Sequence, residues 1–200
     1  MFRKFLIAIF MLLAFSTLIQ AGQINTSLED HIYISNRFMD FKSFAYIVAE
    51  RQRWSLIISN DCSVPHKEVV GDTIREILDN FCRDSEIGWR LVDKCLYIAN
   101  NRELNTFFAQ VETLEKALPD GNKDATYSGY FKGIDLSMLC LFLSSISGTQ
   151  ITVTNGFDSS IMMRVIDMNW KRVLMAIVHL NRYKLSISDF SVLISPENNR

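Results

Sequence analysis

The stretch that decides the fold is "IMMRVIDMNWKRVLMAIVHLNRY", residues 161–183. Its first part alternates in the manner of a strand, since every second side chain falls on the same face. Asn169 can then cap a helix, and the apolar stripe of that helix begins at Trp170. No residue of the stretch is arranged for catalysis. The stretch therefore predicts a packed unit whose function depends on what that unit contacts.

One order of elements, namely strand, helix, strand, strand, helix and hairpin, occurs twice along the chain. In the first half, periodicity predicts strands and helices at 31–38, 40–54, 55–59 and 67–71, a helix beginning at 72 or 73, and a hairpin at 88–99. In the second half it predicts them at 128–133, 134–148, 149–154 and 160–168, with a helix beginning at 169 and a hairpin at 183–195. Gly148 is expected to end its helix as a C-terminal glycine cap.

The two halves stay in register with each other. Leu56 and Ile58 match Ile151 and Val153 at an offset of 95 residues, and the hairpin residues match at an offset of 96. Chance seldom keeps an apolar pattern in register over such a length, so we interpret the chain as an internal duplication.

The fold class predicted is α+β, with two small β-α-β-β-α-β-β domains in tandem at 28–100 and 128–196. A helix and linker at 101–127 are expected to join them. The apolar stripe of that helix favours packing on one of the domains, with dimerisation through the helix as the alternative.

The N-terminus has the pattern of a secretory signal peptide. Arg3 and Lys4 precede an apolar run at 5–19, and the small residue Ala21 follows. The run is shorter than the roughly 20 residues that span a bilayer as a helix. We therefore expect residues 1–21 to be removed on export, with an uncleaved membrane anchor as the alternative.

Charge argues against a nucleic-acid partner. Loss of the signal peptide removes two cations, which leaves 19 Lys and Arg against 22 Asp and Glu, a net charge of −3. A protein that binds nucleic acid usually carries a basic excess instead.

Four cysteines, Cys62, Cys82, Cys95 and Cys140, would lie in an oxidising compartment after export. Cys82 continues an apolar helical stripe and Cys95 lies in an alternating strand, so a helix facing that strand could bring the two together. The pair Cys82–Cys95 is therefore the disulfide we expect. The alternative is a set of buried, reduced thiols.

Catalytic and metal-binding patterns are absent from the sequence. The three histidines, His31, His66 and His179, have no zinc-ligand spacing, and no C-x-x-C occurs. No serine lies in a glycine-flanked nucleophile elbow, and no Gly-rich phosphate loop is present. We expect a protein that is not an enzyme and has no metal, cofactor or small-molecule substrate.

Each half resembles the short N-terminal domain that bacterial secretins share with TonB-dependent receptors. The segment "SSISGTQITV" (144–153) and Trp170, which opens a helix after a turn, are similar to the pilus-secretin version. The segment 69–99, with an aromatic at Trp89, is closer to the receptor version. The first half departs from the pattern, because Arg53 and Trp54 stand where Ser-Gly is usual. The resemblance implies structural roles for Trp170, Trp89 and Gly148, and Trp170 is expected to be a core anchor rather than a docking residue.

The resemblance implies a periplasmic protein-interaction protein, associated with the outer membrane or soluble. The hypothesis is an accessory component of a secretin machine, for type II secretion or type IV pili. Its expected partners are a secretin ring or an inner-membrane component of the same system, and further copies of the chain are also considered. The alternative hypothesis is a signalling module resembling the N-terminal domain of TonB-dependent receptors.

Overall fold

The protein is a mixed α+β structure, as predicted, in a computed structural model that describes residues 27–32, 38–64, 67–154 and 159–197. The predicted signal peptide, most of the first predicted strand and His66 lie outside the described residues. The first half comprises the described residues between 27 and 100, and the second half comprises those between 126 and 197.

Each half contains the predicted helices, and α4 joins the halves. The first half has β1 (Phe38–Met39), α2 (Phe41–Gln52), β2 (Ser55–Ile58), β3 (Lys67–Glu68), α3 (Ile74–Cys82), β4 (Ile87–Val92) and β5 (Cys95–Asn100). The helix α4 (Asn101–Ala117) follows directly. The second half has β6 (Thr126–Asp135), α5 (Leu136–Ser147), β7 (Gln150–Val153), β8 (Ser160–Asn169), α6 (Trp170–Leu180), β9 (Tyr183–Ile187) and β10 (Ser191–Pro196).

Strand pairing is the same in both halves. In the first half β2 runs parallel to β5, β5 pairs antiparallel with β4, and β1 pairs antiparallel with β3. In the second half β7 runs parallel to β10 and β10 pairs antiparallel with β9, as β2, β5 and β4 do. The antiparallel pair of β6 and β8 corresponds to that of β1 and β3. The register agrees as well: Leu56 lies opposite Leu96, and Ile151 lies opposite Val192. The offsets in the sequence therefore mark equivalent positions in space.

The first helix of each half ends at equivalent residues. Gly148 has a φ of 69° and its N–H donates to the Ser144 carbonyl, which is the expected glycine cap. In the first half Arg53 takes this place with a φ of 55°. A non-glycine residue costs about 1–2 kcal/mol in the left-handed region. The missing glycine of the first half thus changes the energy of the turn and not its geometry.

The two halves are joined through one sheet, a contact that the predicted tandem of two domains did not include. The five-stranded sheet has the order β4-β5-β2-β8-β6. At the junction β2 pairs antiparallel with β8, with Ile57 opposite Met163. The reason is that β2 is an edge strand of its own half, and a buried edge strand needs a partner for its backbone groups.

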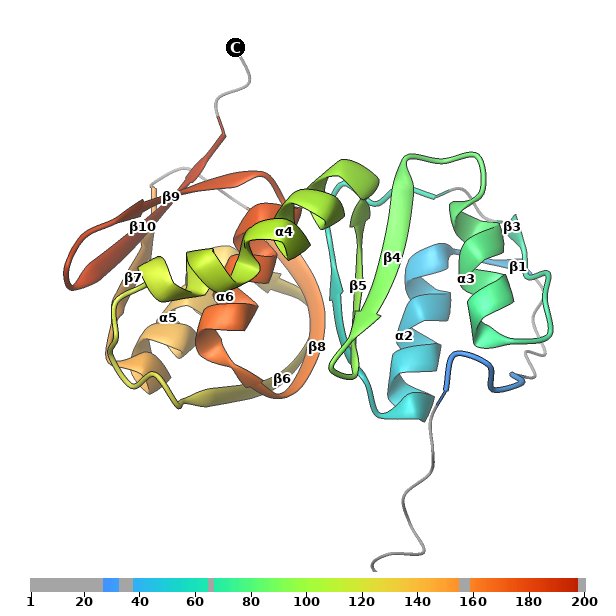
Figure 1. Ribbon diagram of the computed structural model, residues 1–200, viewed down its shortest axis with the longest axis horizontal. Coiled ribbons are helices and arrows are strands. Elements are labelled where there is room, and N and C mark those ends of the chain that lie inside the picture. The colour runs from blue at the N-terminus through green and yellow to red at the C-terminus, as the bar shows by residue number, and fades with distance from the viewer. Residues whose placement is uncertain (1–26, 33–37, 65–66, 155–158, 198–200) are drawn as a thin grey trace, which may run out of the picture.

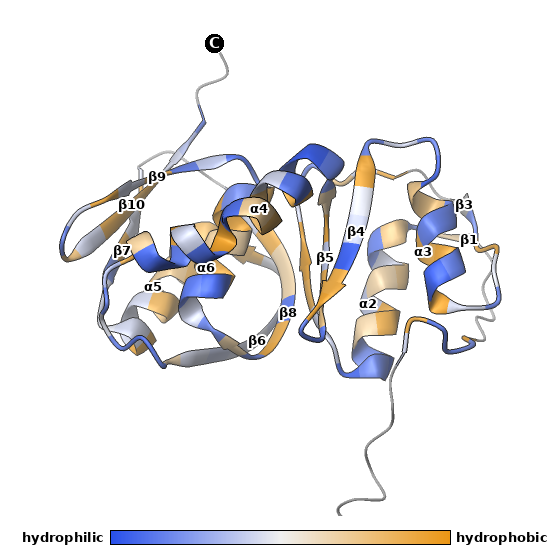
Figure 2. Ribbon diagram, in the orientation of Figure 1, coloured by the Kyte–Doolittle hydropathy of each residue, from blue (hydrophilic) through white to orange (hydrophobic). Residues whose placement is uncertain are grey.

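Both faces of this sheet are covered. Helices α2 and α3 lie on one face, and α4 and α6 lie on the other (Figure 1). In β2, Leu56 and Ile58 belong to the core under α2 and α3, whereas Ile57 belongs to the core under α4 and α6. Consequently every residue of β2 is buried, and the neighbouring β5 is coloured apolar over most of its length in Figure 2.

Helix α4 packs its apolar stripe against both halves, because it contacts β4 and β5 as well as α6; the expectation was that it lies on one of the domains. Its buried residues Leu104, Phe107 and Val111 are part of the core that contains α6. The ammonium of Lys171 on α6 donates to the Leu118 carbonyl just after the end of α4, at 3.1 Å. The apolar stripe of α4 is therefore used within the chain.

The expected Cys82–Cys95 disulfide is wrong. None of the four cysteines forms a disulfide. Cys82 ends α3 and packs against the core under α2 and α3, whereas Cys95 belongs to the core on the other side of the sheet. The backbone of the sheet separates the two thiols, so no rotamer change can join them.

Trp170 lies in a core, which agrees with the expected position. Its side chain is 0% exposed, and its indole N–H donates to the Asn122 carbonyl at 2.9 Å. Val173 and Leu174, which lie on the same apolar stripe of α6 as Trp170, are also buried.

We predict that the fragment 128–200 does not fold by itself. Without β2, the open side of β8 loses its strand partner, and Met163 loses the core residue Ile57 beside it. Thermal unfolding followed by near-ultraviolet circular dichroism should show no cooperative transition for the fragment and one for the chain of residues 22–200. A cooperative transition in the fragment would contradict the shared core.

We predict that Trp170→Ala destabilises the chain of residues 22–200 by about 3–5 kcal/mol, the usual cost of removing a buried aromatic side chain. Trp170→Phe is the matched control. It keeps most of the packing and loses the indole donor, so we expect about 1–3 kcal/mol. Urea unfolding measures both, and an unchanged midpoint for Trp170→Ala would contradict the buried position.

Candidate functional site

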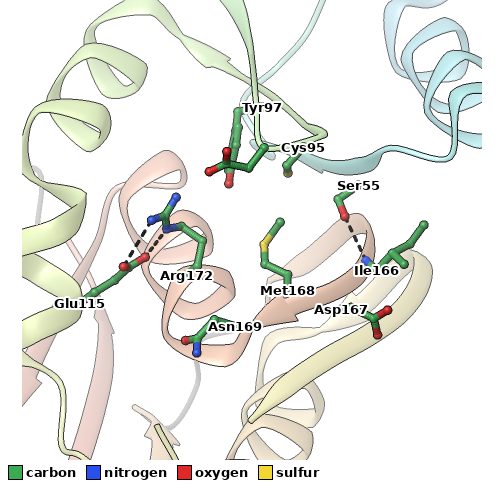
Figure 3. A pocket seen from close by; sticks show the side chains of 10 residues that line it. Ser55, Cys95, Tyr97, Glu115, Ile166, Asp167, Met168, Asn169 and Arg172 are labelled. Carbon is green, nitrogen blue, oxygen red and sulfur yellow. Dashed lines mark hydrogen bonds and ion pairs between the residues drawn. The ribbon is translucent and has the colours of Figure 1, made fainter. Parts of the chain in front are cut away.

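A cavity of about 250 Å³ lies between the two halves, where β8 runs past the end of β2 (Figure 3). At this point the β8 backbone is held by a side chain, because the N–H of Ile166 donates to the Ser55 hydroxyl at 3.0 Å. The lining comes from β2, β5, α4, α6 and β8: Ser55, Asp93, Cys95, Tyr97, Glu115, Ile166, Asp167, Met168, Asn169 and Arg172.

One ion pair occupies the polar side of the cavity. The Arg172 guanidinium on α6 contacts the Glu115 carboxylate on α4 through both Nε and Nη2. The two side chains are 24% and 23% exposed, so water screens them only in part. The hydrogen bond to Glu115 raises the pKa of Arg172 above its usual value. The pair ties α4 to α6 and leaves little of the guanidinium available to an anionic ligand.

The cavity does not activate the Cys95 thiol as a nucleophile. Burial raises the pKa of the Cys95 thiol to about 12, and it also raises the pKa of the Tyr97 phenol. Both groups are therefore protonated at neutral pH, whereas a reactive cysteine needs a lowered pKa. The side chains that line this cavity are suited to holding the halves together rather than to covalent chemistry.

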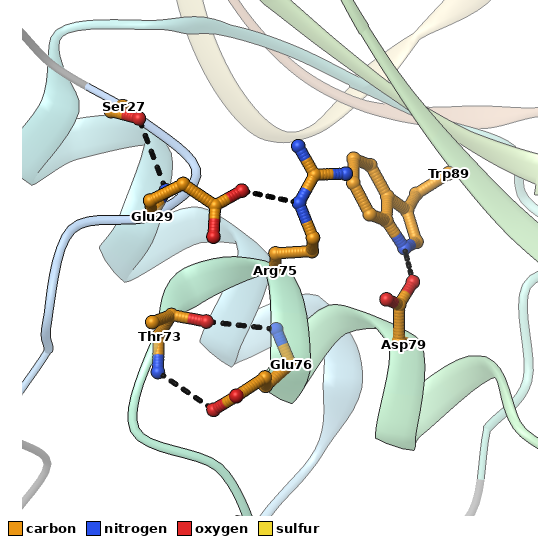
Figure 4. Close-up of polar contacts among 7 residues, drawn as sticks. All are labelled: Ser27, Glu29, Thr73, Arg75, Glu76, Asp79 and Trp89. Atoms are coloured by element: carbon orange, nitrogen blue, oxygen red, sulfur yellow. Dashed lines mark hydrogen bonds and ion pairs between the residues drawn. The ribbon is translucent and has the colours of Figure 1, made fainter.

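Trp89 lies on the first half, on β4, within a cluster of polar contacts (Figure 4). Its indole N–H donates to the Asp79 carboxylate at 3.0 Å, and the Arg75 guanidinium lies 5.8 Å from the ring centroid. Arg75 in turn contacts Glu29, at 2.5 Å. Trp89 thus fastens the start of the described chain and α3 to β4, in keeping with a structural role.

Among the described helices, α5 carries the large apolar side chains that are exposed to solvent. Met138, Leu141 and Phe142 are 47%, 61% and 41% exposed. Phe142 also stacks on Phe131 of β6, with the ring centroids 6.3 Å apart. Figure 2 shows apolar colour along much of this helix. An apolar group of this kind on a protein surface often marks an interaction site.

Sequence reasoning missed this surface. Along α5, Leu139 and Leu143 are buried, whereas Phe142 is 41% exposed. A helix that is apolar all round has no stripe from which to choose an inward side. The available signal was the apolar character of the whole helix, since such a helix is expected to be covered on every side.

A second apolar site lies at the hairpin of β9 and β10. Phe190 is 84% exposed at the turn, and Ile187 and Leu193 are each 41% exposed. The candidate functional site is therefore an interaction surface on the second half, made of α5 and the three-stranded sheet beside it.

Among the described residues, no group of three or more His, Cys, Asp or Glu side chains is placed to hold a metal ion. Nor does that part of the chain contain a helix with the length and apolar character needed to cross a membrane. Comparison with protein-family models finds no match, and comparison with the curated proteins finds no similar protein.

We predict that stability falls as the pH decreases below about 6.5. His179 on α6 packs beside Phe107, and burial lowers its pKa from the ordinary value of 6.5, although Glu103 opposes the shift. The unfolded chain then binds a proton more readily than the folded chain, so acid favours unfolding. The urea midpoint of wild type should decrease between pH 7.5 and pH 5.

His179→Gln is the control for this prediction, because glutamine does not titrate in this range. The decrease in midpoint between the two pH values should be smaller in this variant than in wild type. An identical decrease in both proteins would assign the pH dependence to other groups.

Proposed function

We propose that the chain is a non-enzymatic periplasmic protein-interaction protein, an accessory component of an outer-membrane secretin machine. On this proposal the two halves are modules of the secretin and TonB-receptor type, as their sequence patterns suggest. The observation that carries the proposal is the repeated strand pairing, in which β2, β5 and β4 correspond to β7, β10 and β9.

The contact between the halves supports a role in protein interaction. One module binds the next by adding a strand at its sheet edge, with Leu56 opposite Arg164. Strand addition is a common mode by which proteins recognise extended segments of a partner. A chain made of such modules is therefore suited to joining further modules of the same kind, which is the arrangement expected in a ring-forming machine.

The exposed side chains favour a protein partner over a small molecule. The apolar residues Leu141 and Phe190 are open to solvent, while the charged side chains Arg172 and Glu115 that line the cavity between the halves are paired with each other. Apolar and aromatic side chains dominate the energetically important positions of protein interfaces.

Site-specific crosslinking in cells tests the proposal. A photo-crosslinking amino acid at Leu141 or Phe190 should form an adduct with a secretin or with an inner-membrane component of the same machine. The control position is Glu112, an exposed residue on α4, and it should give no such adduct.

Two outcomes would contradict the secretin assignment. One is an adduct of Leu141 or Phe190 with a regulator of transcription in the inner membrane, which would favour the signalling role instead. The other is an equal yield of secretin adduct at Leu141 and at Glu112, which would indicate random contact.

A further inference from the structure

We propose that β7 and the exposed side of α5 form a docking site for one added β-strand from another protein, and that Ser144 keeps this site closed. The inference rests on the proposed protein-interaction function and names the site and the form of the partner. The first half of the same chain shows the occupied form of the equivalent site.

In the first half, the second half fills the site. The edge of β2 pairs with β8 from Leu56 to Ile58. Beside it, Tyr46 on α2 packs on Tyr130 of β6, with the ring centroids 4.9 Å apart, and the Lys132 ammonium lies 5.7 Å from the Tyr46 ring. One antiparallel pair of strands, β6 with β8, thus covers both a strand edge and a helix face.

In the second half, the equivalent surfaces are open. Among the described residues, β7 is the outer strand of its three-stranded sheet. Leu141 and Phe142 on α5 occupy the positions of Tyr46 and Ile47 on α2, at the offset of 95. Leu141 is 61% exposed, whereas Tyr46 is partly covered by β6. The second half therefore presents the same surface without its occupant, and with a more apolar helix face.

The backbone directions at the two edges agree. In β2, the backbone N–H of Ser55 donates to the carbonyl of Lys94 beside β5. The next residue, Leu56, therefore directs its N–H and carbonyl toward β8. Past the end of β7, Thr154 donates to the Ile194 carbonyl of β10. Because successive residues of a strand alternate in direction, Ile151, the equivalent of Leu56, directs its backbone groups away from β10.

Ser144 occupies the place of the missing strand. The N–H of Ile151 donates to the Ser144 hydroxyl at 2.9 Å, and that hydroxyl donates to the Ile151 carbonyl at 3.3 Å. The equivalent of Ser144 on α2 is Ala49, which has no hydroxyl. The backbone of Leu56 is therefore left for β8, while that of Ile151 is satisfied within its own module. An added strand has to displace the Ser144 hydroxyl from Ile151.

The occupant is a strand with apolar side chains from a different protein. A second copy of the chain would offer β3, which carries Lys67 and Glu68 where β8 carries Met163 and Arg164, at the offset of 96. A carboxylate set against the apolar face of α5 would lose its water without gaining a charged partner. A strand with the character of β8, "SIMMRVIDMN", carries Arg164 at this position, which can donate to a backbone carbonyl as it does to that of Trp54 in the first half, and otherwise presents mostly apolar side chains.

A labelled peptide with the β8 sequence, residues 160–169, is the probe, and the exported chain is the target. Fluorescence anisotropy should show saturable binding to the wild type. Ser144→Ala should tighten the binding about three- to tenfold, since one competing side-chain hydrogen-bond pair is removed. Leu141→Asp should weaken it at least about tenfold by placing a charge under the strand. Val70→Asp, at a residue 55% exposed on the first half, is the control and should bind as wild type does.

Binding that neither Ser144→Ala nor Leu141→Asp alters would overturn the proposal, because it would indicate exchange with the chain's own β8 at β2. Absence of saturable binding to Ser144→Ala, the opened form, would also overturn it. The assay contains no secretin, so its failure leaves the secretin crosslink as a separate result. A secretin crosslink that fails while the peptide binds would instead contradict only the assignment of the machine.

Discussion

The pairing of β2 with β8 is the contact on which the rest of the structure depends. It joins the two halves into one molecule with a five-stranded sheet at the centre. It also places Ile57 and Met163 side by side in the core that α4 and α6 cover. Because α4 lies across this core, the connector is held between the halves rather than extended between two independent domains.

The duplication explains both the similarity and the difference between the halves. Equivalent strands pair in equivalent register, and Arg53 and Gly148 end equivalent helices with positive φ. The halves differ in strand length, since β1 and β3 have two residues each and β6 and β8 have ten each, and in what covers each module. Ala49 leaves the first edge available to β8, and Ser144 satisfies the second within its own module. At the equivalent positions Leu56 and Ile151, the backbone groups thus bond to β8 in one half and to the Ser144 hydroxyl in the other.

Most elements could be predicted from the sequence, because their signals are local. Asn169 and Gly148 mark helix ends, and alternation marks the strand at 160–169. The side-by-side position of β2 and β8 could not be predicted, since strand pairing across more than 100 residues leaves no local signal. The cysteine pairing failed for a related reason. With both faces of β5 buried, the alternation of its residues gives no indication of which helix Cys95 faces. The exposed face of α5 was missed because that helix is apolar all round.

Amide hydrogen exchange at β2 tests the central claim most directly. If β2 is an interior strand between β5 and β8, the amides of Leu56 and Ile58 point toward β8 and should exchange only by global unfolding, as slowly as the amides of β5. If the halves were independent modules, those two amides would lie on an open edge. Fast exchange of Leu56 and Ile58 beside slow exchange of Ile57 would therefore contradict the joined sheet and the equivalence built on it.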